Sequence, residues 1–325
     1  MKLKKSNFIL VVHGEPNSIF LEIFFKSLKK KKFKSPIILI SSEEVLKLQM
    51  KYFNFKKNIR VLDINDLNKY KLEKKSINLI DINYNQKRPF EKISIKSNNF
   101  IKQSFIIAFK IIKKYKLKKL INGPIVKKTF LQKKHLGITE FISKSFNIEN
   151  NAMLIYNKNL SVCPLTTHLP LKYVTKQITK KNIYRKIKLI NDFYKNKFNK
   201  KPKIAILGLN PHCESVHKFN EDEKIVTPTV KLLRKQNFKV SGPHPADTIF
   251  IKKNRDKFDV ILGMYHDQVL TPIKTLFNFE AINITVGLPF IRISPDHGTN
   301  AKMLGKKKSD PSSFFYAMKF AEKLK

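Results

Sequence analysis

Residues 204–212 read IAILGLNPH, and residues 260–268 read VILGMYHDQ. Each stretch begins with an apolar run of strand length, passes through a glycine, and ends in or near a histidine. Short, wholly apolar runs are typical of strands buried on both faces, as in the parallel sheets of α/β proteins. Ligands bind beyond the carboxyl ends of such strands. The two stretches therefore predict both the class of the fold and the edge of the sheet where a site is expected.

Strand and helix signals alternate along the rest of the chain. Ser41-Ser42-Glu43-Glu44 has capping-box spacing before a helix, and residues 152–156 and 160–165 flank a turn and predict an antiparallel hairpin. This alternation predicts an α/β protein of two layered α/β/α domains with largely parallel sheets. Other strands are expected at 8–12, 36–40, 59–62, 77–82, 120–121, 204–209, 260–264 and 282–286, and helices at 17–30, 43–53, 97–115, 179–198 and 312–324.

The composition is that of a globular protein of about two domains, with 325 residues, 42% hydrophobic and 28% charged. It excludes a disordered chain, a collagen and a small disulfide scaffold. Apolar runs such as Phe8–Val12 are far shorter than the ~18 residues of a membrane helix, and no signal-peptide cleavage site follows. Cys163 and Cys213 do not form a C-x-x-C motif, so we expect reduced thiols in a cytoplasmic protein.

The net charge of +42 raises the question of a nucleic-acid surface. Such surfaces usually recruit Arg, but only six of the 66 basic residues are Arg, and the Lys residues are spread along the whole chain. We therefore favour a lysine-coated surface without a specific nucleic-acid partner. The excess charge still attracts anionic substrates.

The nine glycines never occur as G-x-G, which excludes both a Rossmann fingerprint and a Walker A loop. Three histidines, His168, His212 and His266, each follow the end of a predicted strand. Three neutral imidazoles at one sheet edge can hold a Zn²⁺-like ion and leave a position open for substrate. Their spacings of 44 and 54 residues match no local metal motif, so spacing alone leaves three unrelated loop histidines as the simpler interpretation.

The stretch from His244 to Thr299 is dense in polar residues beside Gly and Pro, among them Asp247 and Asp267. Lys274, Asn283 and Arg292 together are suited to holding a phosphate or a carboxylate. The alternative is a set of turn and surface residues, and for Lys274 alone that alternative is the better one in so lysine-rich a chain.

Several long motifs then follow one another in a fixed order. They are Gly208-Leu209-Asn210-Pro211-His212, Pro245-Ala246-Asp247-Thr248, Tyr265-His266-Asp267-Gln268, NITVGLPFIR at 283–292, and Asp296-His297-Gly298-Thr299. Together they resemble the 4-hydroxythreonine-4-phosphate dehydrogenase family, NAD-dependent enzymes of pyridoxine-phosphate biosynthesis. Residues 137–141 and 167–171 fit the same family, so the resemblance runs from about Gly123 to the C-terminus.

The resemblance implies one divalent metal ion (Zn, Mg or Co) on His168, His212 and His266, and substrate contacts from Thr139, Lys274, Asn283 and Arg292. It also implies a fold like that of the isocitrate and isopropylmalate dehydrogenases, with a cleft between two α/β domains and a homodimer that completes the site. Those enzymes bind NAD or NADP without the Rossmann fingerprint. We expect one domain to comprise residues 1–125 and 300–325, and the other residues 126–299.

Three positions depart from the family pattern. Ile138 stands where the family has a substrate-contacting His, and it cannot donate a hydrogen bond. Residues 213–217 replace a glycine-rich stretch, and residues 14–22 lack two glycines of the family's N-terminal motif. Because a side chain at a former glycine can block close approach of a ligand, the changes bear on substrate identity and cofactor affinity more than on the metal site.

The expected reaction is oxidation and decarboxylation of 4-phosphohydroxy-L-threonine to 3-amino-2-oxopropyl phosphate. A metal ion lowers the pKa of the substrate hydroxyl, a base reached through Asp247 or Asp267 removes its proton, and hydride passes to NAD or NADP. Two alternatives within the fold stay open: a paralogous dehydrogenase of a threonate-like or tetronate-like phospho-acid, and a catalytically weakened binding protein. A nucleic-acid-binding protein is the third alternative, and it rests only on the net charge.

Overall fold

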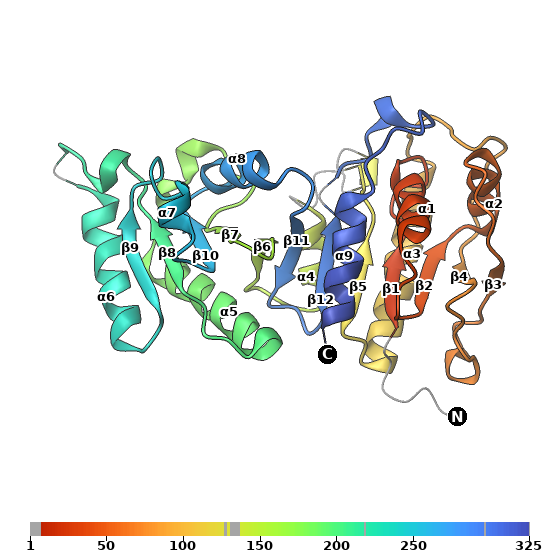
Figure 1. The fold of residues 1–325 in the computed structure, drawn as a ribbon, viewed down its shortest axis with the longest axis horizontal. Coiled ribbons are helices and arrows are strands. Elements are labelled where there is room, and N and C mark those ends of the chain that lie inside the picture. Colours follow the sequence, from red (N-terminus) through yellow and green to blue (C-terminus); the bar gives the residue numbers. More distant parts are fainter. Residues whose placement is uncertain (1–7, 127–128, 131–136, 218, 296, 325) are drawn as a thin grey trace. The chain divides into compact units, whose positions relative to one another are not determined.

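The computed structural model describes residues 8–126, 129–130, 137–217, 219–295 and 297–324 (Figure 1). The chain divides into two compact units, which we call unit 1 (residues 1–142 and 289–325) and unit 2 (residues 143–288). The expected domain boundaries, 125/126 and 299/300, differ from these. Residues 291–295 belong to unit 1 because they form a strand that pairs with residues 119–121.

Unit 1 is built on a parallel sheet with the strand order β3-β4-β2-β1-β5-β12. Its strands are β1 (Ile9–Val12), β2 (Ile37–Ser41), β3 (Ile59–Val61), β4 (Ile77–Asp81), β5 (Lys119–Asn122) and β12 (Ile291–Pro295). Its helices are α1 (Phe20–Lys30), α2 (Glu43–Tyr52), α3 (Ser97–Tyr115), α9 (Ser312–Lys323) and the first turn of α4 (Ile138–Ser145).

Aromatic side chains form much of the core of unit 1. Phe314 of α9 meets Phe20 and Phe24 of α1 edge to face, with ring centroids 5.5 Å apart in both pairs. This geometry is the favoured one for aromatic pairs. The helix expected after Ser41-Ser42 is confirmed, but its cap is Ser42, which accepts a hydrogen bond from the Val45 amide. Because Val45 stands three residues after this cap, the Ser41–Glu44 spacing does not form the expected capping box.

Unit 2 has the strand order β11-β6-β7-β10-β8-β9. All its strands run parallel except β6, which is antiparallel to both β11 and β7. The expected hairpin is therefore confirmed. Its strands are β6 (Ala152–Tyr156), β7 (Ser161–Pro164), β8 (Ile204–Leu207), β9 (Val240–His244), β10 (Val260–Gly263) and β11 (Ile282–Val286), and its helices are α5 (Lys180–Phe198), α6 (Thr227–Lys235), α7 (Lys252–Arg255) and α8 (His266–Phe277).

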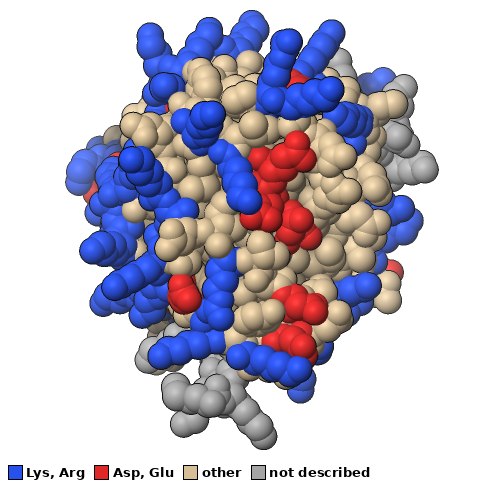
Figure 2. All heavy atoms as spheres, turned by 90° about the vertical axis from the view of Figure 1, so that its right-hand side faces the viewer, with Lys and Arg blue, Asp and Glu red and all other residues tan. Residues whose placement is uncertain are grey.

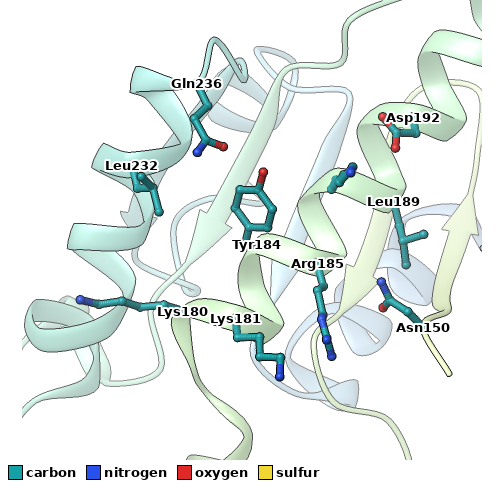
Figure 3. A pocket seen from close by; sticks show the side chains of 10 residues that line it. Asn150, Lys180, Lys181, Tyr184, Arg185, Leu189, Asp192, Leu232 and Gln236 are labelled. Carbon is teal, nitrogen blue, oxygen red and sulfur yellow. The ribbon is translucent and has the colours of Figure 1, made fainter.

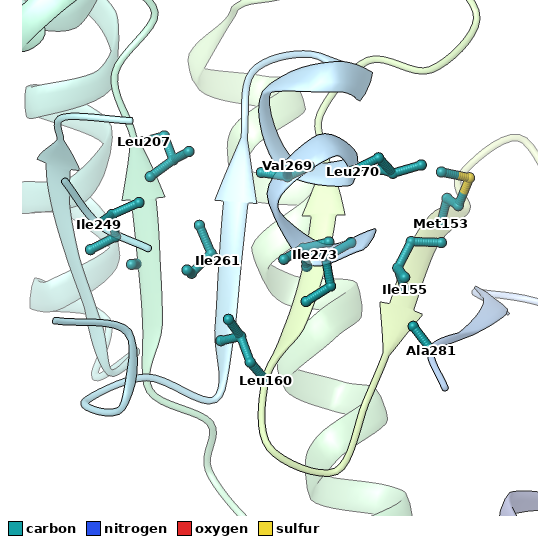
Figure 4. Packing of buried hydrophobic residues seen from close by; sticks show 12 residues of the cluster. Met153, Ile155, Leu160, Leu207, Ile249, Ile261, Val269, Leu270, Ile273 and Ala281 are labelled. Atoms are coloured by element: carbon teal, nitrogen blue, oxygen red, sulfur yellow. The ribbon is translucent and has the colours of Figure 1, made fainter. Parts of the chain in front are cut away.

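The core of unit 2 lies between α8 and one face of this sheet (Figure 4). Val269, Leu270 and Ile273 of α8 pack on alternate residues of the strands, such as Ala205 and Leu207 of β8. Alternate residues of a strand share a face, so this contact fixes which face α8 covers. It also fixes His266, the first residue of α8, at the carboxyl edge of β10.

Candidate metal and substrate site

The three histidines follow three neighbouring parallel strands. His168 comes after β7, His212 after β8 and His266 after β10, and β10 pairs in parallel with both β7 and β8. Because parallel strands end at the same edge, all three histidines lie beyond the carboxyl edge of the sheet in unit 2, where open α/β sheets bind ligands.

His168 and His266 lie side by side, with ring centroids 5.9 Å apart. Two imidazoles that share one ion at ~2.1 Å from each nitrogen have centroids about 5–6 Å apart, so this pair is spaced as two ligands of one metal ion. The Nδ1 atom of His266 lies 2.6 Å from a carboxylate oxygen of Asp267. This contact orients the ring and turns Nε2 away from Asp267, which is the orientation that a carboxylate–histidine–metal arrangement requires.

His212 is exposed and belongs to the turn Pro211–Cys213. Its φ of 54° and the φ of 65° at Cys213 lie in the left-handed region, which costs free energy for residues other than Gly. Within the described ranges, no three His, Cys, Asp or Glu side chains lie close enough together to hold a metal ion. The structure thus brings two of the three predicted ligands together and places the third on the loop of a neighbouring strand.

A buried carboxylate that the sequence did not single out holds the loop of His212. Asp222 is fully buried and accepts hydrogen bonds from the Leu209 amide at 2.7 Å and the Asn210 amide at 2.9 Å. The side-chain amide of Asn210 donates a third bond, at 3.1 Å. A Cβ atom at Gly208 would stand 2.7 Å from the Cys213 sulfur and 3.1 Å from Asp222, so a larger residue there would have to displace one of these side chains.

Two side chains tie the three strand ends to one another. The Gln268 side chain accepts from the Met264 amide at 2.7 Å and donates to the Gly208 carbonyl at 2.8 Å. Thr166 donates to the Met264 carbonyl at 2.8 Å. The segments that carry His168, His212 and His266 are therefore cross-linked by hydrogen bonds, which sets their relative positions before any ligand binds.

The two predicted catalytic carboxylates lie in different surroundings. Asp267 is exposed and contacts the ring of His266. Asp247 is exposed in the turn after β9, and its charge raises the pKa of the Cys213 thiol, after the larger effects of burial and of Asp222. Asp247 therefore lies near the turn that carries His212.

Asn283 and Lys274 are the two predicted substrate contacts in unit 2. Asn283 lies on β11 opposite Ile155 of β6, and its side-chain oxygen is buried without a hydrogen-bond partner in the described structure. A buried acceptor without a donor costs free energy unless a ligand supplies one. Lys274 is exposed on α8, eight residues after His266.

Arg292 and Thr139, the other two predicted contacts, lie in unit 1 and touch each other. Arg292 is 1% exposed; its Nε donates to Asn122 at 2.7 Å and its Nη1 to Thr139 at 3.1 Å. Burial lowers the pKa of Arg292 to about 10, against the opposing effect of Glu140. It remains a cation at neutral pH. Ile138 begins α4 directly before Thr139, and Asp296 of the last motif lies outside the described residues.

The altered N-terminal loop of unit 1 is a buried polar network. His13 and Glu15 are both fully buried. His13 Nδ1 lies 2.7 Å from the Ser41 hydroxyl, and Glu15 accepts from the Asn17 amide and the Ser97 hydroxyl. Burial lowers the pKa of His13 to about 3 and raises that of Glu15. His13 is therefore neutral at physiological pH.

The charged surface and the cavities add little to this site. On the face in Figure 2, Lys and Arg side chains are scattered among uncharged residues, and acidic side chains lie between them.

A cavity of about 690 Å³ lies between α5 and α6, lined by Tyr184, Arg185 and several lysines (Figure 3). None of the predicted site residues, all of which are described, lines it. No helix in the described residues is both long and apolar enough to span a membrane.

Comparisons with known proteins agree with the resemblance seen in the motifs. Residues 32–321 match the family "Pyridoxal phosphate biosynthetic protein PdxA". A 4-hydroxythreonine-4-phosphate dehydrogenase from Sulfurihydrogenibium sp. (strain YO3AOP1) is 37% identical over 327 residues, which cover 98% of each chain. The crystal structure of such a dehydrogenase from Klebsiella pneumoniae superposes with a TM-score of 0.83 at 26% identity, covering 97% of this chain and 98% of that one.

A more distant likeness concerns the fold alone. Isocitrate dehydrogenase from Methylococcus capsulatus superposes with a TM-score of 0.51 at 10% identity, covering 96% of this chain and 83% of that one. The expected α/β fold of the isocitrate dehydrogenase kind is thereby confirmed.

Proposed function

The chain belongs to the pyridoxal phosphate biosynthetic protein PdxA family, and we propose on this basis that it oxidises and decarboxylates 4-phosphohydroxy-L-threonine to 3-amino-2-oxopropyl phosphate. NAD or NADP is the hydride acceptor. The observation that carries the proposal is the histidine edge of unit 2, where His168 and His266 lie at ligand spacing and Asp267 fixes His266.

His168, His212 and His266 would hold one divalent ion. Imidazole nitrogens suit Zn²⁺ and Co²⁺, whereas Mg²⁺ prefers oxygen ligands; of Zn, Mg and Co, the donor set therefore favours Zn or Co. When bound, such an ion polarises the substrate oxygen and stabilises negative charge on it. The hydrogen bonds through Gln268 and Thr166 keep the three histidine segments together and so reduce the ordering that binding requires.

The protein's own residues take the remaining tasks. The substrate hydroxyl gives its proton to the Asp247 carboxylate, the hydrogen on the same carbon leaves as hydride to the nicotinamide, and a β-keto acid results. The bond to its carboxyl group then breaks, CO₂ leaves, and the electron pair stays on the adjacent carbon, which takes up a proton. Asp267 serves as the positioning residue of His266.

The substrate's polar groups match the four predicted contacts. Lys274 and Arg292 bind its anionic phosphate and carboxylate, and Thr139 adds a hydroxyl beside Arg292. The unpartnered oxygen of Asn283 accepts a hydrogen bond from the substrate's ammonium group. An acid that carries a hydroxyl in place of this ammonium group makes a weaker, uncharged hydrogen bond there.

Ile138 favours a second candidate within the same chemistry. An isoleucine directly before Thr139 cannot donate the hydrogen bond expected of a histidine at that position, and a threonate-like or tetronate-like phospho-acid is the alternative substrate. The catalytically weakened binding protein is the third candidate, and it predicts ligand binding without NADH formation.

One experiment separates the three. Purified protein, loaded with Zn²⁺ or Co²⁺, is assayed at 340 nm with NAD or NADP against 4-phosphohydroxy-L-threonine and the two phospho-acids. The proposal expects the highest kcat/KM with 4-phosphohydroxy-L-threonine. A gain limited to that substrate in Ile138→His would mean that the chain has drifted from it, and no change would mean that position 138 is not a substrate contact. A higher kcat/KM with a phospho-acid would establish the alternative, and absence of NADH formation with all three would contradict an enzyme.

The proposal extends to a homodimer in the cytoplasm. Cys163 and Cys213 are free thiols, as expected of a reducing compartment. Light scattering coupled to size-exclusion chromatography tests the dimer: a mass near twice 38.0 kDa is expected, and a mass near 38.0 kDa would contradict it.

A further inference from the structure

Another cavity, of about 410 Å³, lies at the amino edge of the sheet in unit 1, and we call it the amino-edge cavity. Its lining comes from α1 and from the segments that lead into three neighbouring parallel strands. These segments are residues 31–37 before β2, Lys57 before β3 and residues 73–77 before β4. The predicted site residues all lie in the described part of the chain, and none of them lines this cavity. Small-molecule sites have volumes of about 300–1,000 Å³, so the amino-edge cavity is large enough to be one.

The amino-edge cavity is strongly basic. Its described lining holds five lysines and a single carboxylate, that of Glu73. This carboxylate is already paired, because it accepts hydrogen bonds from Arg60 at 3.2 Å and from the Ser76 hydroxyl at 2.6 Å. Among the described residues, none provides an ion-pair or hydrogen-bond partner for any of the five ammonium groups. The five lysines are Lys31, Lys32, Lys57, Lys74 and Lys75.

Lys57 differs from the exposed lysines that coat the protein. It is half-buried, and burial lowers the pKa of its ammonium group, with a smaller effect in the same direction from the charge of Lys32. Two like charges beside a partly desolvated wall destabilise each other. An anion between Lys32 and Lys57 would remove this repulsion, so the pair is suited to a negatively charged ligand.

Most of the remaining lining is apolar. Phe33 is buried and packs against Phe315 of α9, with ring centroids 6.1 Å apart, and Leu28 of α1 is half-buried. An inorganic ion gains nothing from such a wall, whereas the apolar part of an organic anion is stabilised by leaving water. The apolar lining residues are Phe24, Leu28, Phe33, Ile37 and Ile77.

We propose that the amino-edge cavity binds a small organic phosphate, with the phosphate group between Lys32 and Lys57 and the apolar body against Phe33 and Leu28. Lysine binds phosphate as a point charge, and the phosphate oxygens can accept hydrogen bonds from several ammonium groups at once. The site belongs to unit 1 alone, and the inference does not depend on the proposed function.

Isothermal titration of the whole chain with 1-naphthyl phosphate tests this site. A salt concentration of about 0.15 M screens the attraction between exposed charges that lie more than about 8 Å apart. Inorganic phosphate supplies the charge without the apolar body, and 1-naphthol supplies the body without the charge. We expect each of these two to bind at least about tenfold more weakly than 1-naphthyl phosphate. No binding of 1-naphthyl phosphate, or equal affinity for inorganic phosphate, would overturn the inference.

Two double variants separate the cavity from the general positive charge. Lys32→Gln/Lys57→Gln removes two charges from the cavity, and Lys102→Gln/Lys110→Gln removes two from exposed lysines of α3 as the matched control. We expect the affinity for 1-naphthyl phosphate to fall at least about tenfold in the first variant and to stay within about twofold of wild type in the control. Equal weakening in both would indicate attraction to the lysine-coated surface as a whole, and would overturn the inference.

A residue-resolved measurement locates the probe in the wild-type protein. The rate of acetylation of each lysine by acetic anhydride is followed by mass spectrometry, with and without saturating 1-naphthyl phosphate. Because a bound phosphate raises the ammonium pKa and only the neutral amine reacts, Lys32 and Lys57 should react at least about threefold more slowly with the probe. Lys102 and Lys110 should react at unchanged rates. Equal rates at Lys57 with and without the probe would overturn the inference.

Discussion

Replacing Asp222 with Asn removes the negative charge that holds the loop of His212 through three hydrogen bonds. Each hydrogen bond to a charged acceptor contributes ~1.5–3 kcal/mol. An Asn at this position can accept both bonds from Asn210 through one oxygen, while its NH₂ group faces the Leu209 amide. Counting one lost bond to a charged acceptor, we expect the free energy of unfolding of unit 2 to fall by about 1.5–3 kcal/mol.

The same substitution should weaken metal binding, because it loosens one of the three ligands. Loss of such an outer contact typically lowers metal affinity by about 10–100-fold. Isothermal titration with Zn²⁺ measures this affinity, and urea unfolding followed by circular dichroism measures stability, since the chain has no Trp.

Asp63→Asn is the control for this pair of measurements. Asp63 is exposed and accepts a single turn hydrogen bond from the Asn65 amide at 2.8 Å, so its substitution should leave both measurements within about 0.5 kcal/mol of wild type, as for other surface changes. An Asp222→Asn protein with the urea midpoint and Zn²⁺ affinity of wild type would refute the assignment of Asp222 to the loop of His212.

Three further predictions concern the site and the buried histidine. Arg292→Lys should raise KM by about tenfold or more without unfolding the protein, because an ammonium group lacks the planar fork that suits an oxyanion; unchanged steady-state kinetics would contradict this. Asp267→Asn should lower Co²⁺ affinity by about 10–100-fold, measured from the visible absorption of the bound ion. An unchanged affinity would contradict the proposal that Asp267 positions His266 for metal binding. Between pH 6.5 and about 3, His13 binds a proton only in the unfolded chain, so the free energy of unfolding should fall with falling pH by about 1.4 kcal/mol per pH unit. In His13→Gln, the free energy of unfolding measured with urea should depend less steeply on pH. The same dependence as in wild type would contradict the burial of a neutral His13 as its cause.

Local signals sufficed for most elements of the fold. The helix over 97–115 and the strand over 282–286 match the observed bounds of α3 and β11. The prediction missed β9 and β12. Gly242 and Pro243 interrupt the apolar pattern of β9, which tolerates them as an edge strand of the unit 2 sheet. β12 was missed because a charged residue, Arg292, stands at its second position.

The candidate site was predictable where chemistry follows a strand end, and not where it depends on distant partners. His168, His212 and His266 each follow an apolar run, which is a local signal. Asn122 lies 170 residues from Arg292 in the sequence, and no pattern in either segment predicts that these two side chains are in contact. Asp222 stands in the acidic run Glu221-Asp222-Glu223, which is typical of an exposed helix start, and only the folded chain shows that Asp222 is buried.

The most direct test of the whole account is the stoichiometry of the reaction in metal-depleted and metal-restored protein. Protein treated with a chelator is incubated with NAD and carboxyl-labelled 4-phosphohydroxy-L-threonine, before and after addition of one equivalent of Zn²⁺ or Co²⁺, and NADH and labelled CO₂ are measured together. The account predicts little of either product from the depleted protein, and equal amounts of both after one equivalent is restored. Equal product formation with and without the metal ion, or NADH without CO₂, would contradict a metal-assisted oxidative decarboxylation at the histidine edge.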